Sequence, residues 1–555
     1  MIKFKKYDQN EGLALPPYLD ELIDKHHLVR VISHLVDDLP LDLLISGFTS
    51  NKDNQGGNQP YHPKMMLKVL IYSYSQGIYT CRQISRQLRE NVHYMWLSGM
   101  QRPDFRTINR YRSQYFADIL PQVFTEILYV LSKHQLIDLN RVFVDGTKIA
   151  ADANKHKIIW KKKVERYQLH LRERVSRLFE EIESLNLAEM KRYGELDFPE
   201  QGEHNNLSSQ DLEKASSQIS KALERDGRQS KTEVGKKLRK AARQLKEDSK
   251  KLKQYEEQSE ILCERNSASE TDHDASVMKM KNEELRPGYN VQSMTDGEFI
   301  VGVSVSQNAN DGTSLKPLIE EFESQGLSLP KEMGADAGYG HEEVFDYLKD
   351  KGITPYIKYP SLQAERSHET KYRFHYSKFV YDQERDIFIC PLNKDLHYDK
   401  TIEYQTSTGY RTEKRVYRCL DCHVCPFKNK CTQSEEGRSL TVSFKLRGYQ
   451  AEVKERLSTD YGSNLYRERS FRSETVFGDW KHNRKFSRFH LHGLSKVTTE
   501  VILLSLAYNF RKLAGIMPGL YLFFEKNIQK LQLLWFDMAS SWKVNTQIQN
   551  YVFFG

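Results

Sequence analysis

The chain has 555 residues, several times the usual size of one domain, so we expect more than one domain and more than one hydrophobic core. Its 83 Lys and Arg against 75 Asp and Glu give a formal net charge of +8, too small an excess to indicate a polyanionic partner unless the charges cluster. The first residues lack the apolar core of a signal peptide, and no apolar stretch approaches the roughly 20 residues that span a membrane. We therefore expect a cytoplasmic protein, which argues against the secreted and membrane-spanning classes.

Residues 1–130 are expected to form a helical N-terminal domain. Apolar residues recur at helical spacing in PKMMLKVLIYSYSQGI, and TCRQISRQLREN opens with Thr80, a residue type that caps helices. In RPDFRTINRYRSQY, Asp104 can cap a further helix that carries polar and cationic side chains. Such side chains contact phosphates and base edges when a helix enters a DNA groove, which favours a DNA-binding domain, and a solvated helical face is the alternative. The candidates for DNA contact are Arg106, Asn109, Arg110 and Arg112.

Strands and helices alternate in residues 131–154 and 284–360, which predicts an α/β sheet. RVFVDGTKIAAD contains a short apolar run that we expect to form a buried strand ending at Asp145. Two β-branched runs then flank Asp296 and Gly297, a pair that commonly closes a hairpin. LPKEMGADAGYG predicts another buried strand, which delivers Asp336 into a glycine-rich turn and is followed by a helix and a further strand.

Two segments interrupt this α/β pattern and are expected to be insertions. Residues 155–283 are rich in Lys, Arg, Glu, Gln and Leu, with hydrophobic residues spaced for long helices or a helical hairpin. A solvated helical arm is the simplest interpretation, although a basic helix can also lie along DNA. Residues 361–463 contain Tyr, Phe, Val and Thr runs between polar turns, which predicts a β-rich insertion. Residues 464–516 return to helices, and we assign no role to the C-terminal tail, 517–555.

Five of the seven cysteines gather in or near the predicted β-rich insertion. Cys419, Cys422 and Cys425 form two overlapping CxxC units, and such clustering is more typical of a zinc site with four sulfur ligands than of a disulfide framework. We favour Cys390, Cys422, Cys425 and Cys431 as the ligands, because Cys390 begins a CPLN turn that mirrors the CPFK turn at Cys425. Cys419 is then the spare thiol, and reduced cysteines without a metal are the alternative.

Three acidic residues occupy positions from which they could form one site. Asp145 and Asp336 end apolar strands next to small residues, and Glu474 lies on a later helix that is crowded with Arg and Lys. Carboxylates a few ångströms apart repel one another, and hard divalent cations such as Mg²⁺ neutralise them through oxygen ligands. Two such ions stabilise the attacking and leaving oxygens of a displacement at phosphorus. The pattern therefore predicts a metal-dependent phosphoryl-transfer site against a phosphate-binding rim.

The motifs that carry these acids resemble a known family. VDGT on the first strand, GADAGYG on the fourth and SETVFGDWKHNRKFSRF on the later helix look like the ribonuclease-H-like core of DDE transposases from bacterial insertion sequences. One large group of these enzymes carries a Tyr-Arg-Glu-Lys signature, and the corresponding residues here are Tyr466, Arg469, Glu474 and Lys481. Lys481 follows Glu474 by seven positions as the pattern requires, whereas Arg469 precedes Glu474 by five rather than the usual four. The segment YHPKMMLKVLIYSYSQGIYTCRQISRQLRENVHYMWLSGMQRPDFRTINRYR is similar to the N-terminal region of these transposases.

The resemblance implies an α/β fold whose ribonuclease-H-like core is divided among residues 131–154, 284–360 and 464–516, with the first and fourth strands as parallel neighbours. By the same resemblance, the three acids hold Mg²⁺ or Mn²⁺, while the Tyr, Arg and Lys of the signature bind phosphates near the end of the element. The β-rich insertion would hold a structural Zn²⁺, since related transposases often carry a similar cysteine group.

The implied reaction is cleavage of DNA at the terminal inverted repeats of a mobile element and joining of those ends to target DNA. Two ends must be cut and joined together, so the resemblance also implies at least a homodimer assembled on DNA. A hydrolytic nuclease with the same core is the nearest alternative, because water would then attack in place of a DNA 3′-hydroxyl. A DNA-binding protein that has lost catalysis is disfavoured, because all three acids are present.

Overall fold

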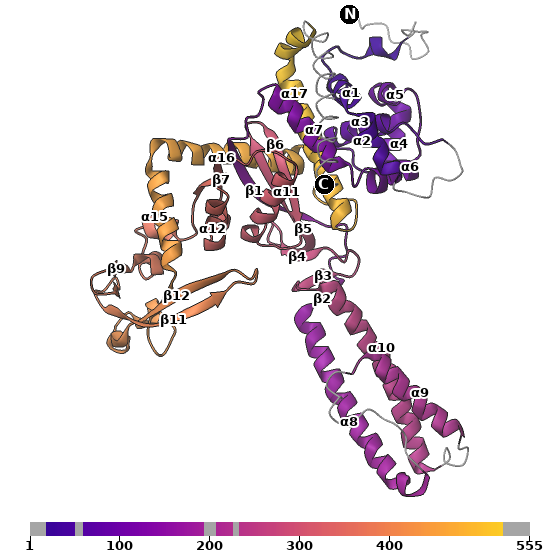
Figure 1. Ribbon diagram of the computed structural model, residues 1–555, viewed down its shortest axis with the longest axis vertical. Coiled ribbons are helices and arrows are strands. Elements are labelled where there is room, and N and C mark those ends of the chain that lie inside the picture. The colour runs from indigo at the N-terminus through magenta and orange to yellow at the C-terminus, as the bar shows by residue number, and fades with distance from the viewer. Residues whose placement is uncertain (1–17, 50–58, 194–206, 226–231, 526–555) are drawn as a thin grey trace, which may run out of the picture.

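The computed structural model describes residues 18–49, 59–193, 207–225 and 232–525 (Figure 1). Four parts can be followed in the ribbon: a helical N-terminal part, a central sheet with its helices, a β-rich lobe and a long helical arm. Most of the predicted C-terminal tail, from residue 526 on, lies outside the described residues. In the part of the chain that the structure covers, no helix is long and apolar enough to cross a membrane.

The N-terminal part consists of short helices that pack around α3. The predicted caps are present, because the Thr80 side chain accepts a hydrogen bond from the Gln83 N–H and Asp104 accepts one from the Thr107 N–H. The elements are η1 (Leu19–Leu22), α1 (Leu28–Asp38), α2 (Leu41–Thr49), α3 (Pro63–Ser75), α4 (Cys81–Glu90), α5 (Val92–Leu97), α6 (Phe105–Arg110), the π-helical turn η3 (Tyr111–Tyr115) and α7 (Leu120–Lys133).

The central sheet has the strand order β4-β5-β1-β7-β8, and β6 pairs with β5. The strands are β1 (Arg141–Ala150), β4 (Ser276–Lys279), β5 (Leu285–Asp296), β6 (Phe299–Ser306), β7 (Glu332–Ala335) and β8 (Thr354–Ile357). β5 runs antiparallel to β1, β4 and β6, whereas β7 runs parallel to both β1 and β8. The predicted hairpin joins β5 to β6 through Gly297, whose φ of +55° suits glycine. The predicted parallel pairing of the first core strand with the fourth is also found.

Helices cover this sheet and connect it to the N-terminal part. They are η6 (Asp311–Thr313), α11 (Leu315–Ser324), η7 (Ala337–Tyr339), α12 (Glu342–Asp350), α16 (Asp460–Gly478), the π-helical turn η11 (Asp479–Asn483) and α17 (Leu494–Glu525). α17 contacts both β6 and α3. One continuous hydrophobic core therefore runs from the N-terminal helices through the sheet to α17, across the domain boundary that we expected at residue 130.

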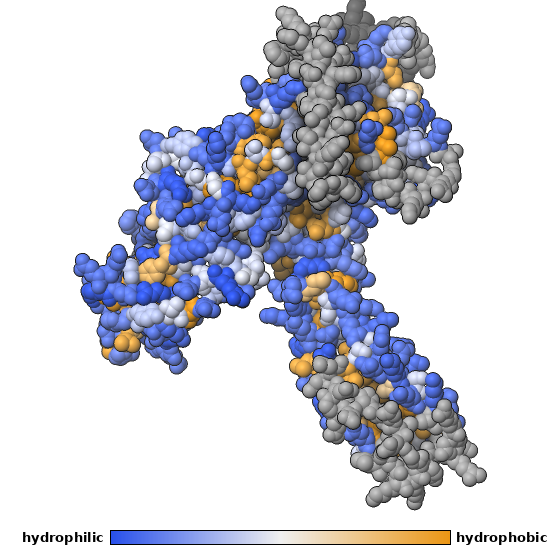
Figure 2. Space-filling model, viewed as in Figure 1, coloured by the Kyte–Doolittle hydropathy of each residue, from blue (hydrophilic) through white to orange (hydrophobic). Residues whose placement is uncertain are grey.

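The predicted helical insertion forms an arm with a small core of its own. Its elements are β2 (Ile158–Trp160), α8 (Lys161–Tyr193), α9 (Ser209–Arg225), α10 (Glu233–Leu262) and β3 (Ser267–Ser269). Phe179, Leu212 and Leu245 are buried among the helices, and β2 pairs with β3 where the arm joins the sheet. The surface of the arm is largely hydrophilic in Figure 2, in keeping with its charged composition. The next strand, β4, lies inside the range expected for the insertion but belongs to the central sheet.

The β-rich insertion forms a five-stranded antiparallel sheet in the order β13-β12-β11-β10-β9. Its strands are β9 (Val380–Asp382), β10 (Ile387–Ile389), β11 (Asp395–Gln405), β12 (Arg411–Arg418) and β13 (Ser439–Val442). The short helices are α13 (Leu362–Arg366), η8 (Thr370–Tyr372), η9 (Tyr376–Lys378), η10 (Leu420–Val424) and α14 (Lys428–Cys431), and the longer α15 (Phe444–Ser458) leads back to α16.

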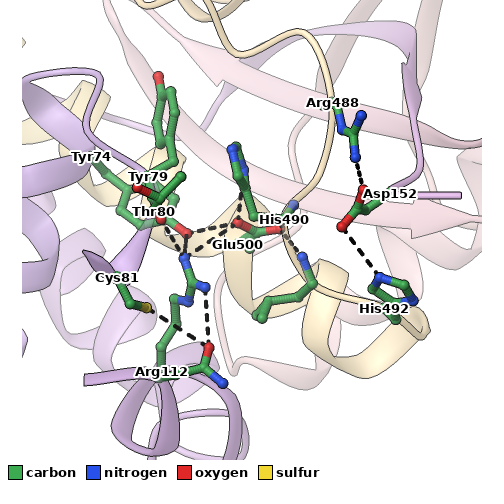
Figure 3. A network of polar contacts seen from close by, with 12 residues as sticks. Tyr74, Tyr79, Thr80, Cys81, Arg112, Asp152, Arg488, His490, His492 and Glu500 are labelled. Atoms are coloured by element: carbon green, nitrogen blue, oxygen red, sulfur yellow. Dashed lines mark hydrogen bonds and ion pairs between the residues drawn. The ribbon is translucent and has the colours of Figure 1, made fainter. Parts of the chain in front are cut away.

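A buried ion pair joins the N-terminal helices to α17 (Figure 3). Arg112 is only 3% exposed, and its guanidinium donates to the Tyr74 hydroxyl (3.1 Å) and the Tyr79 carbonyl (2.7 Å). It also lies 3.8 Å from the carboxylate of Glu500, which is fully buried and accepts from the Tyr74 hydroxyl (2.9 Å) and the His490 N–H (2.7 Å). Burial raises the pKa of Glu500, but contacts with His490 and the Arg112 charge outweigh it, so the pKa stays below its ordinary value.

Replacing Arg112 should destabilise the protein strongly, because Glu500 would keep its charge in the core without a cationic partner. We expect Arg112→Ala to lower the free energy of unfolding by about 3–5 kcal/mol at pH 7. The exposed neighbour Arg110 is a matched control, and Arg110→Ala should stay within about 0.5 kcal/mol of wild type. Urea denaturation measures both values, and equal midpoints for the two variants would contradict the structural role of Arg112.

The deficit of Arg112→Ala should also depend on pH. In the wild type, the pKa of Glu500 lies below its ordinary value of 4.5, so its contribution to stability is present above that pH and is lost as the pH falls through the folded-state pKa. In the variant the unpaired carboxyl would have a raised pKa, and protonation would relieve the buried charge. Denaturation curves at pH 7 and pH 4.5 should therefore show a smaller difference between wild type and variant at the lower pH.

Candidate active site

Asp145 lies on β1 where the neighbouring strand β7 leaves it. β1 pairs with β7 only as far as Val144↔Ala335, whereas its pairing with β5 continues to Ala150↔Gly288. The expectation that this strand ends at Asp145 was therefore wrong, because β5 supports it for five further residues. Along those residues the other edge of β1 has no β7 partner, so Asp145 stands at the start of an open notch in the sheet.

Asp336 follows β7 directly and caps the turn after it. Its side chain accepts a hydrogen bond from the Gly338 N–H (2.7 Å), which fixes the carboxylate at the start of η7. Because Val144 pairs with Ala335 in parallel register, Asp145 and Asp336 are the next residues on the two adjacent strands. The structure thus brings together two acids that are 191 positions apart in the sequence.

Glu474 reaches the same site from α16, which contacts β1, β5, β7 and β8. The pKa of Asp145 is raised to about 6, mainly by burial and also by the charges of Asp336 and Glu474, against the opposing effects of the Gly146 N–H and Arg469. The three predicted acids therefore act on one another electrostatically. Glu474 itself is exposed, so its carboxylate faces the open side of the site.

The other three signature residues, Lys481, Arg469 and Tyr466, lie near these acids. Lys481 lies in η11 and donates to the Thr147 hydroxyl (2.5 Å) and the Lys148 carbonyl (2.9 Å), so it occupies the notch beyond Asp145. Burial lowers the pKa of Lys481 to about 8. Arg469 stands over the Tyr466 ring, 5.2 Å from its centroid, and its Nε is buried without a hydrogen-bond partner.

Sequence reasoning missed a fourth acid that lies against this site, Asp311 in η6. The Asn290 amide donates to its carboxylate (2.7 Å), as does the Gln292 amide (3.3 Å). A Cβ atom at Gly146 would stand 2.8 Å from one Asp311 oxygen, and a Cβ at Gly338 would stand 3.8 Å from the other. The glycines that follow Asp145 and Asp336 therefore leave room for Asp311. Its sequence context, an Asn-Asp-Gly turn, gives no signal of this position.

The donor set suits a hard divalent cation in chemical type. Carboxylate oxygens are the ligands that Mg²⁺ and Mn²⁺ prefer, and the mutual repulsion around Asp145 is what a cation would neutralise. Across the described residues, no three His, Cys, Asp or Glu side chains already stand in a geometry that could hold a metal ion. This statement applies equally to the acids and to the cysteines.

All five clustered thiols line one small cavity in the β-rich lobe. The Cys390 sulfur accepts from the backbone N–H groups of Leu392 (3.4 Å) and Lys394 (3.3 Å), and the Cys422 sulfur accepts from Arg438 (3.3 Å). N–H donors of this kind favour a thiolate. Cys419 differs, because it is buried, and burial together with Cys422 raises its pKa to about 12.

The four predicted DNA contacts of the N-terminal part divide into two groups. Arg106 and Arg110 are exposed on α6, and Asn109 is exposed although its side chain also accepts from Arg112. Arg112 does not present itself to solvent, so the expectation that it contacts DNA was wrong. The cause is the π-helical turn that begins at Tyr111, which rotates Arg112 towards Glu500.

Comparison with known proteins gave two matches to transposase families. Residues 17–114, which include α6, match a transposase domain (DUF772), and residues 389–514, which include Glu474 and Lys481, match a transposase DDE domain. Neither the curated proteins nor the solved structures gave a match. DDE domains belong to enzymes that cut DNA with the help of divalent metal ions. The two matches lie in separate parts of the chain, and together they support a DDE transposase of the bacterial insertion-sequence type.

Proposed function

We propose that this transposase binds the terminal inverted repeats of an insertion sequence, cuts the DNA there and joins the ends to target DNA. The observation that carries the proposal is the parallel β1–β7 register, which sets Asp145 beside Asp336, with the Glu474 charge acting on Asp145. The strand order supports a ribonuclease-H-like core, because β6, β5 and β1 form an antiparallel meander and β7 and β8 continue it in parallel. Asp145 lies on β1, Asp336 follows β7 and Glu474 lies on α16, so the three acids meet only when the chain is folded.

In this proposal Asp145, Asp336 and Glu474 would hold the divalent ions. Mg²⁺ or Mn²⁺, when bound, supplies positive charge next to the attacking and leaving oxygens. The protein's own residues position the DNA: Lys481 and Arg469 offer cations near Asp145, and the Tyr466 hydroxyl can donate to a phosphate. Because α16 carries Tyr466, Arg469 and Glu474 together, one helix couples phosphate binding to the placement of the third acid.

We further propose that the N-terminal part recognises the element's ends through α6, where Arg106, Asn109 and Arg110 are exposed. Two ends have to be processed together, and the active form is therefore at least a homodimer on DNA.

For the β-rich lobe we propose one structural Zn²⁺ held by Cys390, Cys422, Cys425 and Cys431. The N–H donors at Cys390 and Cys422 support thiolates at these positions, and Cys419 is the spare thiol because it is more deeply buried than the other four. The lobe buries few large apolar side chains, so a metal would add stability that its own core cannot supply.

Removing the third acid should separate DNA binding from cutting. Glu474→Gln is expected to slow Mg²⁺-dependent cleavage of a duplex carrying the inverted repeat that borders the gene by about 10³-fold or more, with binding almost unchanged. Glu468→Gln is the matched control, because Glu468 lies on the same helix but forms ion pairs with Arg141 (3.6 Å) and Arg472 (3.3 Å). Gel assays of cleavage and strand transfer measure both variants. Wild-type cleavage by Glu474→Gln would refute the proposed site, and cleavage without joined products would favour the hydrolytic nuclease.

The DNA-binding role of α6 can be tested at Arg110. Arg110→Ala should weaken binding to the inverted repeat, and loss of one phosphate contact should reduce the slope of log affinity against log salt by about one unit. Arg86→Ala on the neighbouring α4 is the control, because Arg86 already pairs with Glu90 (2.9 Å). Fluorescence anisotropy at several salt concentrations measures both, and unchanged binding by Arg110→Ala would reject the assignment.

The zinc proposal predicts the metal content of purified protein. Elemental analysis should find one zinc per chain in the wild type, and Cys425→Ser should lose most of it and lower the melting temperature, because the four-sulfur shell would be incomplete. Cys419→Ser should retain zinc as the spare thiol, and Cys263→Ser, an exposed cysteine on the arm, should behave as wild type. The proposal is wrong if the wild type contains no zinc or if Cys425→Ser retains it.

A further inference from the structure

A lysine continues the row of functional residues across the central sheet. β7 pairs with β8 in parallel register up to Ala335↔Ile357, so Lys358 is the next residue on β8 as Asp336 is on β7 and Asp145 is on β1. Neighbouring strands lie about 4.8 Å apart. Lys358 therefore stands one strand beyond Asp336 in the same row of residues.

Lys358 does not stand alone at this edge of the sheet. Its ammonium lies 3.9 Å from the centroid of the Tyr466 ring, whose other neighbour is Arg469 at 5.2 Å. Arg366, at the end of α13, is close enough to act on Lys358, and burial together with Arg366 and Arg469 lowers the pKa of Lys358. Lys358 and Arg469 thus share the Tyr466 ring, and Arg366 adds a further positive charge that acts on Lys358.

The nearby carboxylates outside the acid site are already bound to other groups, and within that site Arg469 acts on Asp145. Glu365, next to Arg366, accepts from the Tyr359 hydroxyl (2.7 Å) and pairs with Lys454. Glu468 pairs with Arg141 and Arg472. Among the residues that the structure describes, Lys358, Arg366 and Arg469 form no ion pair with a carboxylate, so the cluster has an excess of positive charge that an anion would relieve.

We propose that Lys358 and Arg366, together with Arg469, bind a backbone phosphate of the DNA strand that is cut, next to the scissile phosphate and on its β8 side. This inference rests on the proposed function, because it takes the acids at Asp145 and Asp336 as the site of cutting. Lys358 then supplies a cation at the β8 end of the row that Asp145 and Asp336 begin, and the DNA strand crosses the carboxyl edge of β1, β7 and β8.

Direct binding tests this proposal in the full-length Glu474→Gln protein, which is expected to hold DNA without cutting it. The probe is a duplex carrying the inverted repeat that borders the gene. Lys358→Ala should bind about tenfold more weakly and reduce the salt slope by about one unit, while Lys358→Arg should keep most of the affinity. Lys414→Ala is the matched control, because Lys414 is a half-buried lysine 3.3 Å from the centroid of the Tyr404 ring in the β-rich lobe, away from the acids.

Neutral methylphosphonate linkages, placed one at a time around the cut, identify the phosphate. One position should weaken binding by the parent protein but have no further effect on Lys358→Ala, because the contact is already lost. If Lys358→Ala does not fold, the exposed Arg366→Ala carries the same test. A wild-type salt slope for both variants, or additive effects at every linkage, would overturn the proposal. If either overturning result were found while Glu474→Gln is still inactive in cleavage, the proposed function would be retained and only the proposed phosphate site would be rejected.

Discussion

The parallel pairing of β1 with β7 is the constraint on which the rest of the site depends. It ends at Val144↔Ala335, and from that point the two chains part: β1 continues beside β5, while β7 turns away at Asp336. Parallel strands cannot be joined by a short turn, so the connection between them has to leave the sheet and return. The two acids are therefore brought together by backbone hydrogen bonds between distant segments, and the helix that carries Glu474 only has to pack across strands whose positions are already set.

Negative and positive side chains occupy separate places around the β1–β7 pair, with acids at its end and cations beside them. Burial, together with the charges of Asp336 and Glu474, raises the pKa of Asp145, and cations that form no ion pair within the described part of the chain lie to the side of the acids. A folded protein ordinarily pairs its buried charges, as Arg112 and Glu500 do at the junction with α17. The contrast indicates that the unpaired charges of the site are kept for ligands outside the chain, with divalent cations at the acids and phosphates at the lysines and arginines.

How much of this could be predicted from the sequence depended on how local the signal was. Asp145 and Asp336 follow apolar runs, and the Asp296–Gly297 turn and the caps at Thr80 and Asp104 are set by residues within a few positions, so all of them were predicted. Arg112 was misjudged, because the π-helical turn that directs it inward depends on packing against α17. Asp311 and Lys358 were missed for the same reason: neither has a motif, and only the strand register and two glycines place them beside the acids.

Both insertions leave the strand register of the central sheet intact, because each begins and ends between elements of the core and not within a strand. The arm leaves after β1 and returns before β4, and β2 pairs with β3 at its base, so the two ends of a segment of more than one hundred residues are held together as in a short loop. The helices of the arm bury a hydrophobic core of their own, so the packing of the central sheet does not depend on how long these helices are. The β-rich lobe is different, because it lies between β8 and α16 and returns through α15, which contacts both. Its folding therefore bears directly on where α16 begins, and a zinc ion in the lobe would act on Glu474 through that connection rather than through any contact with the acids.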